Sequence, residues 1–199
     1  IQPGTVFTTS NYTEPSSVAY ADLESNTYTQ ASSSTINGGD GDDSLAGGGG
    51  NDSITSGQGV DTVDGGSGND TILFGPGGAT SADGDSVAGG DGDDLIDDVS
   101  GMAVWDYDDT LDGGAGNDTI YAGAGEDLVY GGTGNDHIYG EDGNDTIYGG
   151  AGTDTIYSGN GDDSVFGGDD GDWIEGGSGN DHLEGEGGND VLLAGSGND

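Results

Sequence analysis

From residue 38 onward, single aliphatic residues recur among glycines and polar residues at an interval of nine. Gly38–Ala46 is the first unit, and Gly113–Tyr121 is a later one with the sequence Gly-Gly-Ala-Gly-Asn-Asp-Thr-Ile-Tyr. The eighth position is Leu, Ile or Val in all sixteen units that reach it, and the sixth is Asp in all seventeen. The fourth is Gly in every unit except one, where it is Asp170. Such a period predicts a solenoid of stacked short elements.

Positions seven to nine of each unit have the composition of a short strand. Thr119-Ile120-Tyr121 is typical, because β-branched and aromatic residues favour strands. Side chains alternate along a strand, so position eight faces one side while positions seven and nine face the other. The preceding glycines can turn sharply because glycine adopts positive φ without a steric penalty. Two units then close one coil, which predicts a thin aliphatic core between two parallel sheets.

The repeat divides the chain into two regions. Residues 1–37 are rich in Ser and Thr and poor in Gly, and we interpret them as a candidate assembly or docking arm without a fold assignment. Residues 38–199 form the predicted solenoid, which carries two six-residue insertions at 78–83 and 102–107. Both insertions fall in odd-numbered units, so we expect them to leave the same edge, one coil apart. They are either turn insertions that pack on themselves, which we favour, or a contact site for a partner.

The charge balance excludes several classes of partner. The chain has 40 Asp and Glu, no Lys or Arg, and a formal net charge of −40, together with 47 Gly and only 29% hydrophobic residues. Without cations such a chain would repel itself and stay expanded. No basic side chain is present to neutralise phosphates, which argues against nucleic acid. No apolar run approaches the length of a transmembrane helix, and the absence of Cys excludes disulfides.

Stacked coils would place the position-six aspartates close together. Equivalent turns lie eighteen residues apart in sequence, so Asp43 is predicted to lie beneath Asp61 at roughly 4.8 Å. Such stacking is unfavourable unless cations lie between the carboxylates. Carboxylate and carbonyl oxygens are the ligands that Ca²⁺ prefers, whereas Zn²⁺ prefers His or Cys. Seventeen turns stacked two apart hold at most about fifteen such ions. The predicted metal ligands are Asp43, Asp52, Asp61, Asp70, Asp85, Asp94, Asp109, Asp118, Asp127, Asp136, Asp145, Asp154, Asp163, Asp172, Asp181, Asp190 and Asp199.

The repeat resembles the G-G-x-G-x-D-x-U-x nonapeptide of the RTX (repeats-in-toxin) family. The resemblance covers residues 38–199 and departs from the pattern at the first glycine in Ser56, Phe74, Asp98, Ala122, Ser158 and Ala194, and at the second in Val99, Glu141 and Glu186. It implies an all-β fold, a right-handed parallel β-roll (β-solenoid) of two stacked parallel sheets with Ca²⁺ in the turns. It also implies type I secretion, folding on contact with extracellular calcium, and a location outside the cell or at its surface. The C-terminal secretion signal of such proteins is not visible in these residues.

No catalytic motif occurs in the sequence, so we do not expect an enzyme. His137 and His182 both fall at position seven on different sheets and form no pair. We favour a calcium-binding extracellular structural protein, such as a surface-layer, adhesin-stalk or filament subunit, that folds on binding Ca²⁺. The incomplete last unit, ending at Asp199, favours end-to-end self-association. The alternative is a calcium-folded repeat module of a larger secreted enzyme, toxin or ice-binding adhesin.

Aromatic residues occupy position nine in six successive units and alternate between the two predicted sheets. We favour stacking that stabilises each sheet face. The alternative is a flat surface for contact with polysaccharide, a cell surface or a neighbouring subunit. The six residues are Tyr121, Tyr130, Tyr139, Tyr148, Tyr157 and Phe166.

Overall fold

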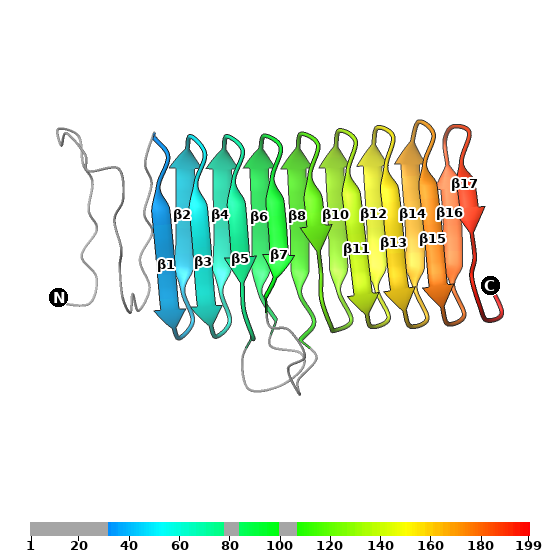
Figure 1. Ribbon diagram of the computed structural model, residues 1–199, viewed down its shortest axis with the longest axis horizontal. Helices are drawn as coiled ribbons and strands as arrows, with labels where there is room; N and C mark the ends of the chain where they lie inside the picture. Colours follow the sequence, from blue (N-terminus) through cyan, green and yellow to red (C-terminus); the bar gives the residue numbers. More distant parts are fainter. Residues whose placement is uncertain (1–31, 78–83, 100–106) are drawn as a thin grey trace.

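The computed structural model describes residues 32–77, 84–99 and 107–199, and in this part of the chain every regular element is a strand. The strands form two parallel sheets that lie face to face and run the length of the molecule (Figure 1). Odd-numbered strands make one sheet and even-numbered strands the other, so each strand pairs with the next but one in the chain. The predicted β-roll with two units per coil is therefore confirmed.

The odd-numbered sheet consists of β1 (Thr35–Asp40), β3 (Ser53–Gln58), β5 (Thr71–Phe74), β7 (Leu95–Asp98), β9 (Thr119–Tyr121), β11 (His137–Asp142), β13 (Thr155–Asn160), β15 (Trp173–Ser178) and β17 (Val191–Leu193). The even-numbered sheet consists of β2 (Ser44–Gly49), β4 (Thr62–Ser67), β6 (Ser86–Asp91), β8 (Thr110–Ala115), β10 (Leu128–Thr133), β12 (Thr146–Ala151), β14 (Ser164–Asp169) and β16 (His182–Glu186). Among the described residues no helix is long and apolar enough to cross a bilayer.

Most strands are six residues long, and the prediction of three-residue strands was wrong. Strand β12, for example, continues through Gly149 and Gly150 to Ala151, and Gly150 pairs with Gly132 on one side and Gly168 on the other. The first glycine of a unit is extended, whereas those at the second and fourth positions, such as Gly150 and Gly152, have φ of 112° and 129°. The turn itself therefore occupies only positions four to six, and two of the glycines belong to the sheet.

The core is one column of aliphatic side chains between the sheets, as predicted. Position-eight residues from Leu45 to Ile174 are at most 3% exposed. Leu183 is half-buried against this core and Leu192, in the last coil, is 41% exposed. Position one also faces inward, since Phe74 and Ala122, which replace glycine there, are fully buried. One buried aliphatic side chain per unit, without any long core element, is typical of a fold whose stability is distributed coil by coil.

Two boundaries differ from the sequence prediction by a few residues. The sheet begins at Thr35, where Ile36 is buried and pairs with Ile54, so one strand precedes the first complete unit. Tyr107 occupies the fourth position of its unit, because its N–H donates to Ala124 O in the way that Gly125 N–H donates to Asp142 O. The second insertion therefore ends at Asp106, one residue earlier than predicted.

The two insertions interrupt the same edge of the roll. Strand β5 precedes the first and β7 the second, and these strands pair directly, with Phe74 opposite Asp98. Strands β6 and β8, which follow the insertions, also pair directly. The expected placement one coil apart is confirmed. Residues 78–83 and 102–106 of the insertions, and residues 1–31 of the N-terminal segment, lie outside the described residues.

Candidate metal centre

The position-six aspartates form two columns, one along each edge of the roll. One column follows the odd-numbered strands and contains Asp43, Asp61, Asp85, Asp109, Asp127, Asp145, Asp163, Asp181 and Asp199. The other follows the even-numbered strands and contains Asp52, Asp70, Asp94, Asp118, Asp136, Asp154, Asp172 and Asp190. The fifteen aspartates from Asp43 to Asp181 are at most 5% exposed. The structure therefore buries these carboxylates instead of leaving them on a hydrated acidic surface.

From Asp52 to Asp199, each aspartate uses one carboxylate oxygen to bind the backbone of the neighbouring coil. Asp136 N–H donates to Asp154 Oδ1 at 2.8 Å, and Asp154 N–H donates to Asp172 Oδ1 at 2.8 Å. The same contact recurs along both columns, from Asp43 N–H with Asp61 Oδ1 at 2.9 Å to Asp181 N–H with Asp199 Oδ1 at 3.2 Å. The aspartate carbonyls accept N–H groups from position seven of the next coil, as Asp136 O does from Thr155 at 2.8 Å. The backbone of the turn is thus satisfied without the second carboxylate oxygen.

The second oxygen, Oδ2, is buried and lacks a hydrogen-bond partner among the described residues. A buried anionic oxygen without a partner destabilises the folded state by roughly several kcal/mol. Such an oxygen therefore requires a cation or a proton beside it. The residues with this feature include Asp70, Asp85, Asp94, Asp118, Asp127, Asp136, Asp145, Asp154, Asp172 and Asp181.

The first glycine of each unit leaves room in front of these oxygens. A Cβ added to Gly113 would lie 2.6 Å from Asp118 Oδ2 and 2.6 Å from the carbonyl oxygen of Gly131 in the next coil. At Gly131 the corresponding distances are 2.7 Å to Asp136 Oδ2 and 2.5 Å to Gly149 O. A carboxylate oxygen and a carbonyl oxygen therefore converge on a space that any side chain at position one would fill. Ser158 replaces glycine at this position in one unit, and its Oγ donates to Gly176 O at 2.8 Å.

The two columns of position-six aspartates together form the aspartate ladder. Burial raises the pKa of many carboxyl groups in this ladder. The pKa of Asp118, Asp145 and Asp154 rises to about 7, chiefly because burial disfavours the charged form. The backbone N–H bond to each carboxylate opposes this rise, and neighbouring ladder aspartates reinforce it. The pKa of Asp127 rises to about 9 for the same reasons, with Asp145 and Asp109 as its nearest ladder neighbours in the column. At neutral pH the metal-free ladder therefore resists full ionisation.

The oxygen atoms present fit calcium better than other divalent ions. No group of three or more His, Cys, Asp or Glu side chains within the described ranges is placed to hold a metal. Each gap in the ladder instead offers the carboxylates of neighbouring coils together with backbone carbonyls. Ca²⁺ accepts six to eight oxygens in flexible geometry, while Zn²⁺ requires nitrogen or sulfur ligands and Mg²⁺ a near-ideal octahedron. The donor set thus fits Ca²⁺, and all of its predicted side-chain members are aspartates.

The predicted ligands in the last coil are less buried than those in the rest of the roll. Asp190 is only half-buried and Asp199 is exposed, since both belong to the last coil. The insertions do not disturb the ladder: Asp61 N–H binds Asp85 Oδ1 at 2.8 Å and Asp85 N–H binds Asp109 Oδ1 at 2.6 Å. Sequence reasoning missed Ser34, which occupies position six before β1 and donates its N–H to Asp52 Oδ1 at 2.5 Å. The sequence Thr35-Ile36-Asn37 after it carries the strand signal that reveals this position.

The aromatic residues at position nine stack on both sheet faces, which confirms the favoured interpretation. On the odd-numbered sheet, Tyr121, Tyr139 and Tyr157 have ring centroids 4.6 and 5.2 Å apart and nearly parallel planes. The even-numbered sheet carries a similar stack, described below. His137 and His182 lie on different sheets and form no pair, as predicted. His182 Nε2 lies 2.7 Å from Glu184 Oε1 instead.

Comparison with known proteins identifies the repeat. A family model described as the RTX calcium-binding nonapeptide repeat matches in four copies, at residues 35–72, 106–138, 130–165 and 166–199. These matches together cover about two thirds of the chain. A search of curated proteins finds no match. Repeats of this family bind calcium, in agreement with the buried carboxylate columns. The chain belongs to the family of RTX calcium-binding nonapeptide repeat proteins.

Proposed function

We propose that this chain is a calcium-binding extracellular structural protein that folds when it binds Ca²⁺, such as a subunit of a surface layer, an adhesin stalk or a filament. The buried Oδ2 atoms without a partner carry the proposal. They make the metal-free roll unfavourable at neutral pH, so the free energy of calcium binding becomes free energy of folding. Proteins with these repeats are typically secreted, and extracellular calcium at millimolar level suits sites of this kind.

Calcium between neighbouring ladder aspartates also accounts for the charge. The columns of nine and eight aspartates contain fifteen gaps between neighbours, eight in one column and seven in the other. Fifteen Ca²⁺ ions would reduce a net charge of −40 to about −10. When bound, Ca²⁺ supplies the positive charge that the chain lacks. The aspartates then hold the ions while their Oδ1 atoms keep neighbouring coils in register.

The last described coil leaves apolar side chains exposed that the coils before it bury. Val191, Leu192 and Leu193 of β17 are 42%, 41% and 43% exposed, although the equivalent position-eight residue of β15, Ile174, is fully buried. A second copy that stacked on this coil would cover these side chains and pair with the free edges of β16 and β17. A continuing chain would do the same, which supports the alternative that these residues are a calcium-folded module of a larger secreted enzyme, toxin or ice-binding adhesin.

A calcium titration followed by far-UV circular dichroism, with light scattering on the same sample, tests the proposal. We expect a coil-to-β transition at about 10⁻⁴–10⁻³ M Ca²⁺, with scattering that rises over the same range. A matched titration with Mg²⁺ should leave the chain unfolded. A β-rich spectrum in calcium-free buffer at neutral pH would contradict calcium-dependent folding. A calcium-dependent transition with constant scattering would contradict self-association and support the module.

A further inference from the structure

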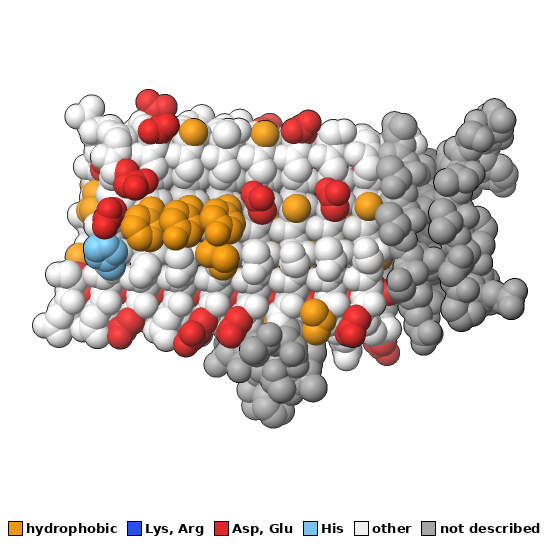
Figure 2. Space-filling view, turned by 180° about the vertical axis from the view of Figure 1, so that it is seen from behind, with side chains coloured by type: hydrophobic (Ala, Val, Ile, Leu, Met, Phe, Trp, Pro, Cys, Tyr) orange, Lys and Arg blue, Asp and Glu red, His pale blue; other side chains and the backbone are white. Residues whose placement is uncertain are grey.

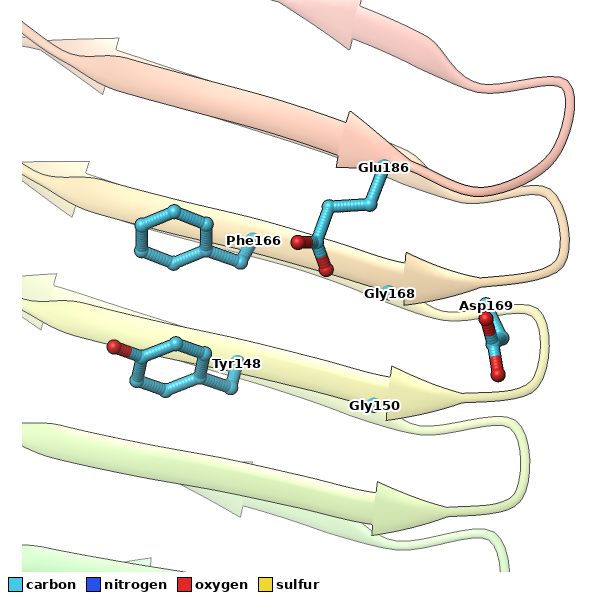
Figure 3. A pocket seen from close by; sticks show the side chains of 6 residues that line it. All are labelled: Tyr148, Gly150, Phe166, Gly168, Asp169 and Glu186. Atoms are coloured by element: carbon cyan, nitrogen blue, oxygen red, sulfur yellow. The ribbon is translucent and has the colours of Figure 1, made fainter.

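A shallow groove of about 390 Å³ lies on the outer face of the even-numbered sheet and extends to the turn that follows β14. Its lining consists of Tyr148, Gly150, Phe166, Gly168, Asp169 and Glu186. Figure 3 shows the two aromatic rings side by side over β12 and β14, with the Glu186 side chain reaching down from β16 beside Phe166. Asp169 lies at the adjacent turn, so one end of the groove is aromatic and the other is acidic.

The aromatic end belongs to a stack that remains open to solvent. The ring centroids of Tyr130 and Tyr148 are 5.2 Å apart and those of Tyr148 and Phe166 are 5.0 Å apart, with planes inclined by only 10°. Such distances correspond to offset stacking, in which each ring covers only part of its neighbour. Tyr130 and Tyr148 are 39% and 37% exposed. A row of hydrophobic side chains flanked by acidic ones is visible on one face of the roll (Figure 2).

The acidic end is built from a residue that departs from the repeat. Glu186 occupies the second position of its unit, where glycine is usual, and its φ of 62° is unfavourable for a residue with a side chain. It pairs with Gly168, which has no side chain, and Gly168 pairs in turn with Gly150. The glutamate side chain therefore lies over Gly168 and Gly150, next to the aromatic stack. Conformational strain at an exposed polar residue is frequent where that residue binds a ligand.

The charges of the groove are unbalanced. The carboxylates of Asp169 and Glu186 are exposed and have no hydrogen-bond or ion-pair partner within the described part of the chain. No Lys or Arg occurs anywhere in the 199 residues, so neither this chain nor a second copy of it supplies a lysine or arginine side chain. The complement of the groove is a cationic group from another molecule that also has an apolar or planar surface.

We propose that this groove binds an arginine side chain of a basic partner protein. A guanidinium group is planar, so it stacks on an aromatic ring while its fork of N–H donors binds a carboxylate in a bidentate manner. Tyr148 and Phe166 supply the aromatic surface, and Glu186 and Asp169 supply the carboxylates. Lysine offers a compact ammonium that cannot stack. A neutral sugar would also stack on aromatic rings but would gain nothing from two unpaired negative charges.

The test uses the full chain saturated with calcium and a fluorescein-labelled tetra-arginine amide in 150 mM NaCl, with binding followed by fluorescence anisotropy. We expect Glu186→Gly to weaken binding about tenfold, because one charge-assisted bidentate contact is lost. This variant restores the residue that the repeat uses at this position, so it should keep the fold. Phe166→Ala should weaken binding by a similar factor, and a tetra-lysine amide should bind more weakly than tetra-arginine to the unmodified chain.

Glu141→Gly provides the matched control. Glu141 is the equivalent second-position glutamate on the odd-numbered sheet, has a φ of 73° and pairs with Gly159. Its replacement changes the net charge and the backbone strain as Glu186→Gly does, but on the other face, so we expect binding within twofold of the unmodified chain. Equal weakening by both variants would show general charge attraction and overturn the proposal. Displacement of the peptide by a neutral maltohexaose, or absence of binding, would also overturn it.

Circular dichroism of every variant in the same calcium buffer separates this proposal from calcium-dependent folding. A chain that acquires its β spectrum with calcium and yet does not bind tetra-arginine would contradict the arginine site alone. A chain that stays unfolded in calcium would contradict the proposed function first.

Discussion

At the residue scale, one aspartate per unit performs two tasks with its two oxygens. Oδ1 accepts the N–H of the ladder aspartate in the preceding coil, as Asp154 does from Asp136 at 2.8 Å, and this contact fixes the register of the turns. Oδ2 is left buried and faces the space before the first glycine of its unit. Glutamate would carry its carboxylate one methylene farther and could not keep the short backbone contact. This explains why position six is never Glu, although Glu occurs at Glu175 and Glu184.

Replacement of Asp154 by asparagine should separate these two tasks. Asn keeps an oxygen that accepts the Asp136 N–H, but it removes a carboxylate whose pKa burial raises to about 7. We expect the variant to bind about one or two fewer calcium ions, because the gaps on both sides of residue 154 lose a carboxylate. We also expect the calcium-free chain to be slightly more stable than the unmodified one. Isothermal titration calorimetry and urea unfolding without calcium measure the two effects.

The control for this substitution is Asp112→Asn, which removes an equal charge from an exposed strand position. It should leave the number of bound ions unchanged. An equal loss of ions in both variants would indicate that overall charge, and not the ladder, determines calcium binding.

At the element scale, the sequence predicts the sheets and the ladder but misplaces their limits. The nine-residue period identifies the sixth and eighth positions directly, since only Asp and aliphatic residues occur there. The sequence predicts that the glycine pair belongs to the turn, because glycine adopts positive φ without a steric penalty. In the roll, however, Gly149 and Gly150 extend β12, since stacking of identical coils satisfies their backbone groups. The sequence identifies Glu186 only as a departure from the pattern, because its position over Gly168 beside Phe166 depends on the register of three coils.

Two fourth-position glycines differ in a way that separates backbone strain from steric overlap. Gly41 and Gly134 have φ of 112° and 132°, and a Cβ added at Gly41 meets no atom within 4 Å. A Cβ at Gly134 would overlap the carbonyl oxygen of Gly116 in the preceding coil. We expect Gly41→Ala to cost about 1–2 kcal/mol from φ alone. Gly134→Ala should cost clearly more, because neighbouring coils must also separate.

Urea unfolding of both alanine variants in saturating calcium measures this difference. Equal losses of stability would show that the close stacking of the turns contributes nothing beyond the conformational preference of glycine.

At the scale of the whole molecule, charge determines when the roll is stable. The thin core is continuous, but a net charge of −40 and buried carboxylates in two columns oppose the folded state whenever they are all ionised. Two agents can relieve this opposition, because an unpartnered buried oxygen accepts either a cation or a proton. In the proposed function calcium is the agent at neutral pH, and we expect protons to become the agent as the pH falls.

The stability of the calcium-free chain should therefore rise on acidification. Burial raises the pKa of Asp118, Asp145 and Asp154 from 3.8 to about 7, so the folded state binds more protons than the unfolded state between these values. The stabilisation from these groups is complete below about pH 4 and is lost as the pH rises through about 7. Circular dichroism in metal-depleted buffer should show a β-rich spectrum near pH 5 that disappears by pH 8. Light scattering on the same samples separates folding from precipitation, because the isoelectric point is near 4.1.

The calcium-loaded chain should respond in the opposite sense, because protons compete with calcium for the same oxygens. Its affinity for calcium should therefore fall as the pH is lowered. A calcium-free chain that became less structured between pH 8 and pH 5 would contradict the assignment of the buried carboxylates as the groups that hold the apo roll unfolded.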